Sequence, residues 1–156
     1  FIFTHKHSDH YSKKNVKKVL KEKGGQQFGV SNISELESLS RKIKDFKIEA
    51  FKTKHKVFGI SFRHYSYLIT WYGKKIYLSG DTTSAETIGT VKNIDLAFVP
   101  FWLYENAKNN KITIDAKKIG IYHLYDIQTK AAKKYFKEKE NQFPVTNKGE
   151  IFVLKL

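Results

Sequence analysis

The segment T-H-K-H-S-D-H, residues 4–10, follows a short apolar run and carries three histidines and one aspartate. His5 and His7 are two positions apart, so their imidazoles point to the same side of an extended chain. Asp9 and His10 come next and need a turn to face the same centre. Imidazole and carboxylate groups at this density are typical of a site for one or two transition-metal ions, with zinc as the first choice. We therefore prefer a metal site to a histidine-rich surface loop.

The chain has 156 residues, of which 40% are hydrophobic, and this is enough for a packed core. We find no internal repeat or linker and predict a single domain over residues 1–156. No apolar run approaches the ~18 residues that a membrane span requires. Because the sequence has no Cys, disulfides and thiolate metal sites are excluded. The chain begins at Phe1 and has no Met, so we expect preceding residues, including any targeting signal, to be missing. The compartment stays open, with the cytoplasm slightly favoured.

The net charge of +14 arises from 29 basic and 15 acidic residues. A basic surface can attract nucleic acid or anionic substrates. All but two of the basic residues are Lys, the exceptions being Arg41 and Arg63, whereas surfaces that bind phosphate often use the forked guanidinium of Arg. We therefore interpret the Lys residues mainly as solvated faces. Nucleic acid, which only the net charge favours, is therefore the less favoured partner, and the oligomeric state stays open.

Several segments carry recognisable signals for helices and strands. Ser12 can cap a helix over residues 12–23, which the following glycines end. Residues 34–44 are ambiguous between a helix and a loop with a short strand. Residues 72–75 are typical of the turn of a β-hairpin. The other predicted elements are strands at 1–4, 27–30, 46–54, 57–62, 64–71, 76–78, 94–99, 119–122 and 151–154, helices at 84–89, 116–119 and 128–139, and a loop at 101–110.

Strands and helices alternate in the second half of the chain, which predicts an α/β fold. Residue types that bind metals come directly after predicted strands, at the place where α/β proteins hold their ligands. The candidate metal ligands are His5, His7, Asp9, His10, His55, Asp81 and His123. They should meet at one edge of the sheet.

The pattern H-x-H-x-D-H at residues 5–10, followed by S-G-D-T at residues 79–82 after a hairpin, resembles the metallo-β-lactamase superfamily of metal-dependent hydrolases. The resemblance covers nearly the whole chain, with the motifs in the right order. It implies an αββα sandwich of mixed sheets with outer helices, whose first strands are missing from this sequence. It also implies two divalent metal ions as cofactors, with zinc as the first choice and manganese or iron compatible with the same ligands.

The resemblance assigns the candidates to two metal positions with one shared ligand. The first position would be held by His5, His7 and a later His, the second by Asp9, His10 and His123, and both by Asp81. The later His is either His55 or His64. His55 is favoured, because the family places this ligand after a strand and before the hairpin. His64 would then lie behind the ligands, face the substrate or be exposed.

The activity that the resemblance implies is hydrolysis of an ester, lactone, amide or phosphodiester bond by a hydroxide bridging the two metal ions. Asp9 and Asp81 would be catalytic, because they balance the metal charge and orient the hydroxide. We expect a small-molecule or lipid-like substrate.

One alternative is an RNA-processing nuclease of the same superfamily, although Tyr11-Ser12 stands where those enzymes usually have Gly. Another is an inactive, truncated binding domain. Residues 101–104 either line the pocket or cover the core.

Overall fold

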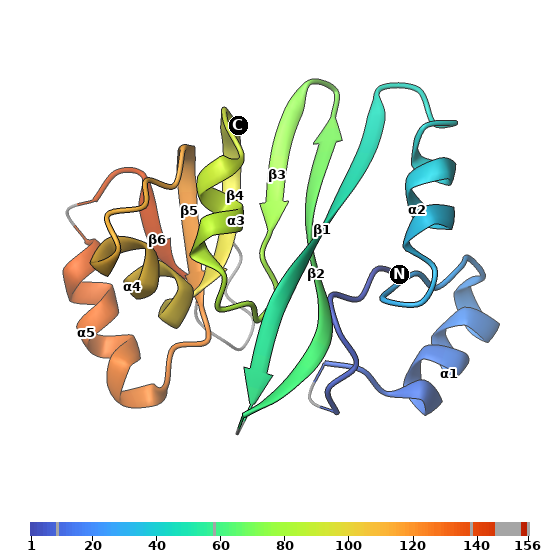
Figure 1. Cartoon of the computed structure of the whole chain (residues 1–156), viewed down its shortest axis with the longest axis horizontal. Coiled ribbons are helices and arrows are strands. Elements are labelled where there is room, and N and C mark those ends of the chain that lie inside the picture. The colour runs from blue at the N-terminus through green and yellow to red at the C-terminus, as the bar shows by residue number, and fades with distance from the viewer. Residues whose placement is uncertain (9, 58, 138, 146–153, 156) are drawn as a thin grey trace.

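The computed structural model of the chain describes residues 1–8, 10–57, 59–137, 139–145, 154 and 155. The strands among these residues are β1 (Phe46–Val57), β2 (Ile60–Trp71), β3 (Lys74–Leu78), β4 (Ile94–Pro100), β5 (Ala116–Tyr122) and β6 (Gln142–Pro144). They form one mixed sheet in the order β1-β2-β3-β4-β5-β6 (Figure 1). The pairs β1–β2 and β2–β3 are antiparallel, and the later pairs are parallel. The expected α/β architecture is confirmed.

The helices in the described part of the chain are α1 (Lys13–Lys23), α2 (Ile33–Ser40), α3 (Ala85–Thr90), α4 (Phe101–Asn109) and α5 (Asp126–Phe136). The Ser12 hydroxyl caps α1 by accepting a hydrogen bond from the backbone N–H of Asn15. The helices predicted at 12–23, 84–89 and 128–139 are confirmed as α1, α3 and α5, and the ambiguous segment 34–44 contains α2. No helix among the described residues has both the length and the hydrophobicity that a membrane crossing requires.

Two predictions near the parallel strands are wrong. Residues 101–110, expected to form a loop, contain α4, because Leu103 and Ala107 lie four residues apart on one helix face and are buried in the core. Residues 116–119, expected to form a helix, begin β5, because their backbone pairs with β4 in a parallel ladder.

The end of the chain also differs from the prediction. The strand β6 occupies residues 142–144, where none was expected. The strand predicted at 151–154 falls mainly on residues 151–153, which lie outside the described part of the chain.

The middle of the sheet is more regular than predicted. The strands expected at 57–62 and 64–71 are one strand, β2, which pairs with the whole of β1. The turn between β1 and β2 contains Gly59, whose φ of +81° permits a tight reversal of the chain. Residues 1–4 and 27–30, both expected to form strands, make only a single bridge between Ile2 and Phe28. The β1–β2 hairpin is therefore the longest unit of the sheet.

Two hydrophobic cores lie on opposite faces of the sheet. The larger core lies under α3 to α5 and includes Val99 of β4 and Ile121 of β5, both fully buried. The smaller core lies between α2 and the β1–β2 hairpin. Because side chains alternate along a strand, Ile48 of β1 packs in the smaller core and Phe51 against the larger one. Figure 1 shows α3 and α4 over the parallel strands, and α2 beside β1.

The N-terminal segment lies beside the part of β2 that β3 leaves open. β3 pairs with only residues 67–71 of β2. At Tyr65, before that part of the strand, the backbone N–H donates to the carbonyl oxygen of Thr4 at 3.0 Å. The hydroxyl of Tyr67 donates to the carbonyl oxygen of Phe3 at 2.9 Å. The histidines of residues 5–10 therefore lie next to the loop that follows β3.

Asp95 is a buried carboxylate in the otherwise apolar strand β4. Its Oδ1 accepts a hydrogen bond from the Lys117 ammonium at 2.7 Å, and its Oδ2 accepts one from the backbone N–H of Lys75 at 2.8 Å. These two bonds lower the pKa of Asp95 below its usual 3.8. A carboxyl group whose pKa is lower in the folded state stabilises the protein above its unfolded pKa, and this stability is lost as the pH falls through the folded pKa.

We expect Asp95→Asn to lower the free energy of unfolding at pH 7 by about 1–2 kcal/mol, because a charge-assisted acceptor is removed from a buried position. The variant should also lose less stability than the wild type below about pH 4. Urea unfolding at several pH values measures both effects. Lys117→Gln is the comparison variant and should cost less, because that side chain is 72% exposed. A wild-type unfolding curve for Asp95→Asn at pH 7 would contradict this account.

Candidate metal centre

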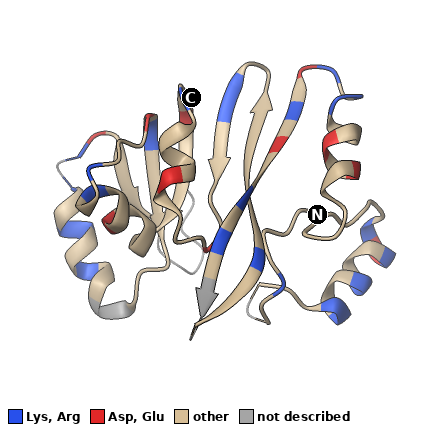
Figure 2. Ribbon diagram, viewed as in Figure 1, with Lys and Arg blue, Asp and Glu red and all other residues tan. Residues whose placement is uncertain are grey.

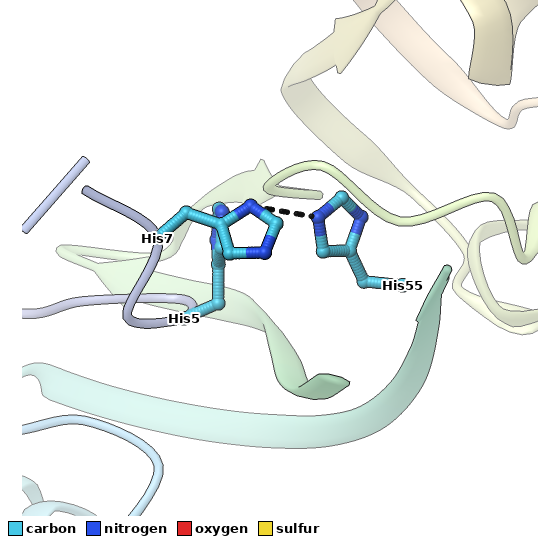
Figure 3. A group of neighbouring side chains, drawn as sticks. All are labelled: His5, His7 and His55. Carbon is cyan, nitrogen blue, oxygen red and sulfur yellow. Dashed lines mark hydrogen bonds between the residues drawn. The ribbon is translucent and has the colours of Figure 1, made fainter. Parts of the chain in front are cut away.

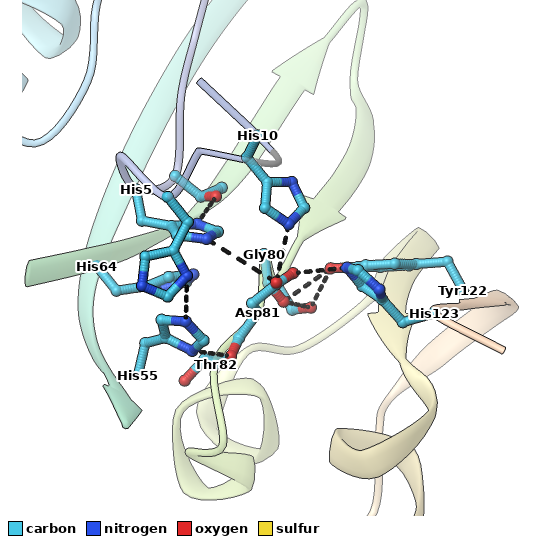
Figure 4. Close-up of polar contacts among 12 residues, drawn as sticks. His5, His10, His55, His64, Gly80, Asp81, Thr82, Tyr122 and His123 are labelled. Carbon is cyan, nitrogen blue, oxygen red and sulfur yellow. Dashed lines mark hydrogen bonds and ion pairs between the residues drawn. The ribbon is translucent and has the colours of Figure 1, made fainter. Parts of the chain in front are cut away.

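The six histidines of the sequence gather in one region of the structure, together with Asp81 (Figures 3 and 4). They come from the N-terminal segment, from β1, from β2 and from the end of β5, and Asp81 comes from the loop after β3. The histidines are His5, His7, His10, His55, His64 and His123. Segments far apart in the chain thus converge on one carboxylate.

One group of possible metal ligands consists of His5, His7 and His55, whose nearest ring nitrogens lie within 4.8 Å of one another. Figure 3 shows the rings of His7 and His55 facing each other, with 3.3 Å between His7 Nδ1 and His55 Nε2. The Nδ1 of His55 lies 2.7 Å from the carbonyl oxygen of Asp81. Because a carbonyl only accepts hydrogen bonds, this Nδ1 carries the proton. The other ring nitrogen of His55, Nε2, faces His7, and an imidazole anchored in this way through Nδ1 has the orientation of a metal ligand.

A second group consists of His5, His10 and Asp81, whose ligand atoms also lie within 4.8 Å of one another. The Asp81 carboxylate is 3.0 Å from His10 Nε2 through Oδ2 and 3.2 Å from His123 Nε2 through Oδ1. His123 has a φ of +56°, a conformation that is uncommon outside glycine and recurs at functional sites. Asp81 is therefore central to the second group and lies beside the first (Figure 4).

The electrostatics of the cluster favour a neutral His5 beside an ionised Asp81. Burial lowers the pKa of His5, the Asp81 carboxylate opposes this, and the neighbouring imidazoles add to the lowering, so that the pKa comes to about 4. Burial raises the pKa of Asp81, but the hydrogen bond from His123 and the charges of the surrounding histidines outweigh it and bring the pKa to about 2. At neutral pH, His5 therefore offers a lone pair and Asp81 a negative charge, which are the forms that bind a metal ion.

A buried nitrogen without a partner supports the fit of a metal ion. His5 is 1% exposed, and its Nε2 has no hydrogen-bond partner among the described residues. A buried polar atom left in this way costs free energy unless something binds it. His5 belongs to both groups of possible ligands, and its Nε2 lies 3.9 Å from Asp81 Oδ2. The residues present thus fit a cation in their number, chemistry and protonation.

His64 lies in the same region but belongs to neither group of ligand atoms. The side chain is fully buried, which excludes the third of the alternatives given for it, an exposed position. Its Nδ1 is 2.6 Å from the hydroxyl of Thr53, and its Nε2 lies against Gly80 without a hydrogen-bond partner among the described residues. The geometry therefore places His55, rather than His64, with His5 and His7.

The structure brings together six of the seven candidate ligands, and Asp9 lies outside the described residues. Sequence reasoning missed the side chains that hold the Asp81 loop. The Tyr122 hydroxyl donates to the carbonyl oxygen of Gly80 at 2.7 Å. The indole N–H of Trp102 donates to the carbonyl oxygen of Thr82 at 3.2 Å. Trp102 also packs against the His123 ring. This contact places part of the 101–104 segment at the site, and the position of Tyr122 beside His123 was the only available signal for the tyrosine.

These observations define the class of the fold. A mixed sheet whose strand ends bring histidines and an aspartate to one edge is the arrangement of the metallo-β-lactamase fold, and this chain has that fold. The resemblance inferred from the signature is confirmed at the level of the fold. The expected sandwich is represented, in the described residues, by a single sheet with helices on both faces.

Two solved structures illustrate the similarity. YhfI of Bacillus subtilis, a metallo-β-lactamase fold protein, matches with a TM-score of 0.59 and 17% identity over 97% of this chain and 76% of its own. A provisionally assigned metal-dependent hydrolase from Parabacteroides distasonis matches with a TM-score of 0.58 and 20% identity over 92% of this chain and 73% of its own. No family model and no curated protein matches the sequence.

Proposed function

We propose that this protein is a metal-dependent hydrolase whose centre takes two divalent cations, zinc first and manganese or iron as alternatives. The observation that carries the proposal is the convergence of histidines from four segments around Asp81. The solved structure from P. distasonis is that of a protein assigned as a metal-dependent hydrolase, which agrees with this function.

Each cation would have its own set of ligands. The first would be held by His5, His7 and His55, the second by His10, His123 and Asp9, and Asp81 would be shared. In this assignment the buried Nε2 of His5 gains the partner that it lacks among the described residues. The carbonyl oxygen of Asp81 fixes the His55 ring, so one residue orients ligands in both sets.

The proposed reaction is hydrolysis of an ester, lactone, amide or phosphodiester bond. Divalent cations supply an acidified water molecule and polarise the oxygen of the bond that is attacked. The Asp81 carboxylate, with its pKa of about 2, stays ionised and balances positive charge throughout. Trp102 and Tyr122 hold the loop that carries Asp81, so the carboxylate is positioned before a substrate binds. A small-molecule or lipid-like substrate is proposed.

Metal content tests the proposal most directly. We expect purified protein, dialysed free of loose metal, to retain about two zinc-like ions per chain by mass spectrometry. His7→Ala should lose the first ion, because its imidazole faces His55 across 3.3 Å. Protein that binds no metal would exclude the proposed function.

A matched pair of variants tests which histidine completes the first set. His55→Ala should lose one ion, whereas His64→Ala should retain both, since His64 belongs to neither group of ligand atoms. An equal loss of metal from the two variants would reverse this assignment.

A nuclease acting on RNA is the second candidate function, and the charge of α1 favours it. This helix carries six lysines, one glutamate and no buried residue (Figure 2). Binding to RNA through such a surface should weaken steeply as salt is added, because counterions are released from the phosphates. Cleavage of single-stranded RNA with that salt dependence, without turnover of small esters, would place the nuclease first.

A further inference from the structure

The β1–β2 hairpin carries a basic groove of about 400 Å³, whose residues Lys52, Lys54 and Arg63 alternate to the face opposite the imidazoles of His55 and His64. Its lining residues are Lys52, Thr53, Lys54, Ser61, Phe62 and Arg63. Figure 2 shows basic residues along the half of β1 that leads to this groove. No carboxylate is among the lining residues, so the cations there are not neutralised within the groove.

The strand register places two of these cations directly opposite each other. Lys54 of β1 pairs with Arg63 of β2, and Lys52 lies two residues away on the same side of the hairpin. Like charges in directly opposite positions destabilise a sheet. Among the described residues, none of the three forms an ion pair with a carboxylate. An anion bound between the side chains would turn this repulsion into attraction.

The arginine at position 63 indicates which kind of anion the groove binds. Arg63 is one of only two arginines in a chain with 29 basic residues. A guanidinium presents paired N–H donors that match two oxygens of a phosphate, whereas an ammonium acts as a point charge. Ser61 adds a hydroxyl to the same groove. One forked donor, two ammonium groups and a hydroxyl make a set suited to a phosphate group.

We propose that Lys52, Lys54 and Arg63 bind a phosphate group of the ligand on the hairpin face behind the metal centre. The groove is linked to that centre through the backbone of Lys54. Its carbonyl oxygen accepts hydrogen bonds from the Thr82 hydroxyl at 2.8 Å and the Thr83 N–H at 3.1 Å, both in the loop that follows Asp81. This inference rests on the proposed function, because the phosphate is taken to belong to the substrate. The groove would then select phosphorylated substrates, and the bound phosphate would lie outside the bond that is cleaved.

The test compares phosphate binding in the wild type, Arg63→Gln, Lys54→Gln and the control Lys47→Gln. Lys47 is also on β1, but it pairs with Glu49 and lies outside the groove. Calorimetric titration with inorganic phosphate on metal-free protein should give about tenfold weaker binding in both groove variants and no change in the control. Without phosphate, the groove variants should melt about 1–2 °C higher than the wild type, because a repulsive pair is removed.

The outcomes separate this site from general surface charge. Equal weakening in Lys47→Gln, or no phosphate binding by the wild type, overturns the proposal. A short thymidine oligonucleotide in place of phosphate identifies the source of the group: tighter binding that Arg63→Gln abolishes indicates a nucleic acid strand, and binding no tighter than phosphate indicates a small phosphate ester. Because the titration needs neither metal nor turnover, failure of the metal-content test leaves its result interpretable.

Discussion

Asp81→Asn is expected to remove hydrolytic activity and at least one bound metal ion. The Asp81 carboxylate lies within 3.9 Å of three imidazole nitrogens, from His5, His10 and His123. An amide of the same shape has no negative charge to balance the proposed cations and offers one acceptor oxygen in place of two. We expect kcat/KM to fall by about three orders of magnitude, equivalent to about 4 kcal/mol of transition-state stabilisation.

The control for this variant is Asp115→Asn. The Asp115 carboxylate accepts a hydrogen bond from the backbone N–H of Asn93, and it precedes β5 at the opposite end of that strand from His123. It should keep the metal content and the activity of the wild type. Metal analysis and hydrolysis of a panel of model esters and phosphodiesters measure both variants. Full metal content together with full activity in Asp81→Asn would show that this carboxylate is not a ligand.

Much of the site could be predicted, because ligand residues at strand ends leave a pattern in the sequence. The signature at residues 5–10, Asp81 in its Gly-Asp-Thr turn and His123 after a buried strand are each recognisable by local spacing. Parallel strands bring their carboxyl ends to one edge, so convergence of Asp81 and His123 follows from the fold class. The structure adds that His55 is inside β1, two residues before its end, rather than beyond it.

The features that escaped prediction depend on contacts between distant residues. The predicted break in β2 falls at Arg63, beside the polar residues His64 and Ser66, yet both of these are fully buried. The Nδ1 of His64 and the hydroxyl of Ser66 find their partners only in three dimensions, in the hydroxyl of Thr53 and the carbonyl oxygen of Ser79. Local sequence cannot reveal such partners. The helix α4 escaped for a related reason, because its aromatic and amide residues are weak helix formers and tertiary packing stabilises it.

Gly80→Ala is expected to be the most destabilising single methyl addition near the site. Gly80 has a φ of +59°, which costs an L-residue about 1–2 kcal/mol. A Cβ at this position would lie 2.5 Å from His64 Nε2 and 2.7 Å from Thr4 Cβ. The His64 ring cannot easily withdraw, because it is fully buried and bonded to Thr53 at 2.6 Å. With an overpacking cost of about 1–3 kcal/mol, the total loss is roughly 2–5 kcal/mol.

Gly73→Ala separates the two causes of this loss. Gly73 has a φ of +75° in the β2–β3 turn, but its added Cβ would meet no atom within 4 Å. Urea unfolding in the presence of chelator should therefore show a loss of only about 1–2 kcal/mol for Gly73→Ala. The difference between the two variants measures the contact of Gly80 with His64 and Thr4. Equal losses in the two variants would mean that this contact is loose.

A double-mutant cycle with His64→Ala then tests whether His64 is the main obstacle to a side chain at position 80. Removing the imidazole opens space for the new methyl group, so Gly80→Ala should cost less in the His64→Ala background than in the wild type, by about 1–2 kcal/mol. Additive losses would assign the clash to Thr4 instead. Because Gly80 precedes Asp81, the same cycle read by metal content reports how firmly the packing of His64 positions that carboxylate. If Gly80→Ala loses metal and the double variant with His64→Ala regains it, the buried histidine acts through the backbone, without binding the ion itself.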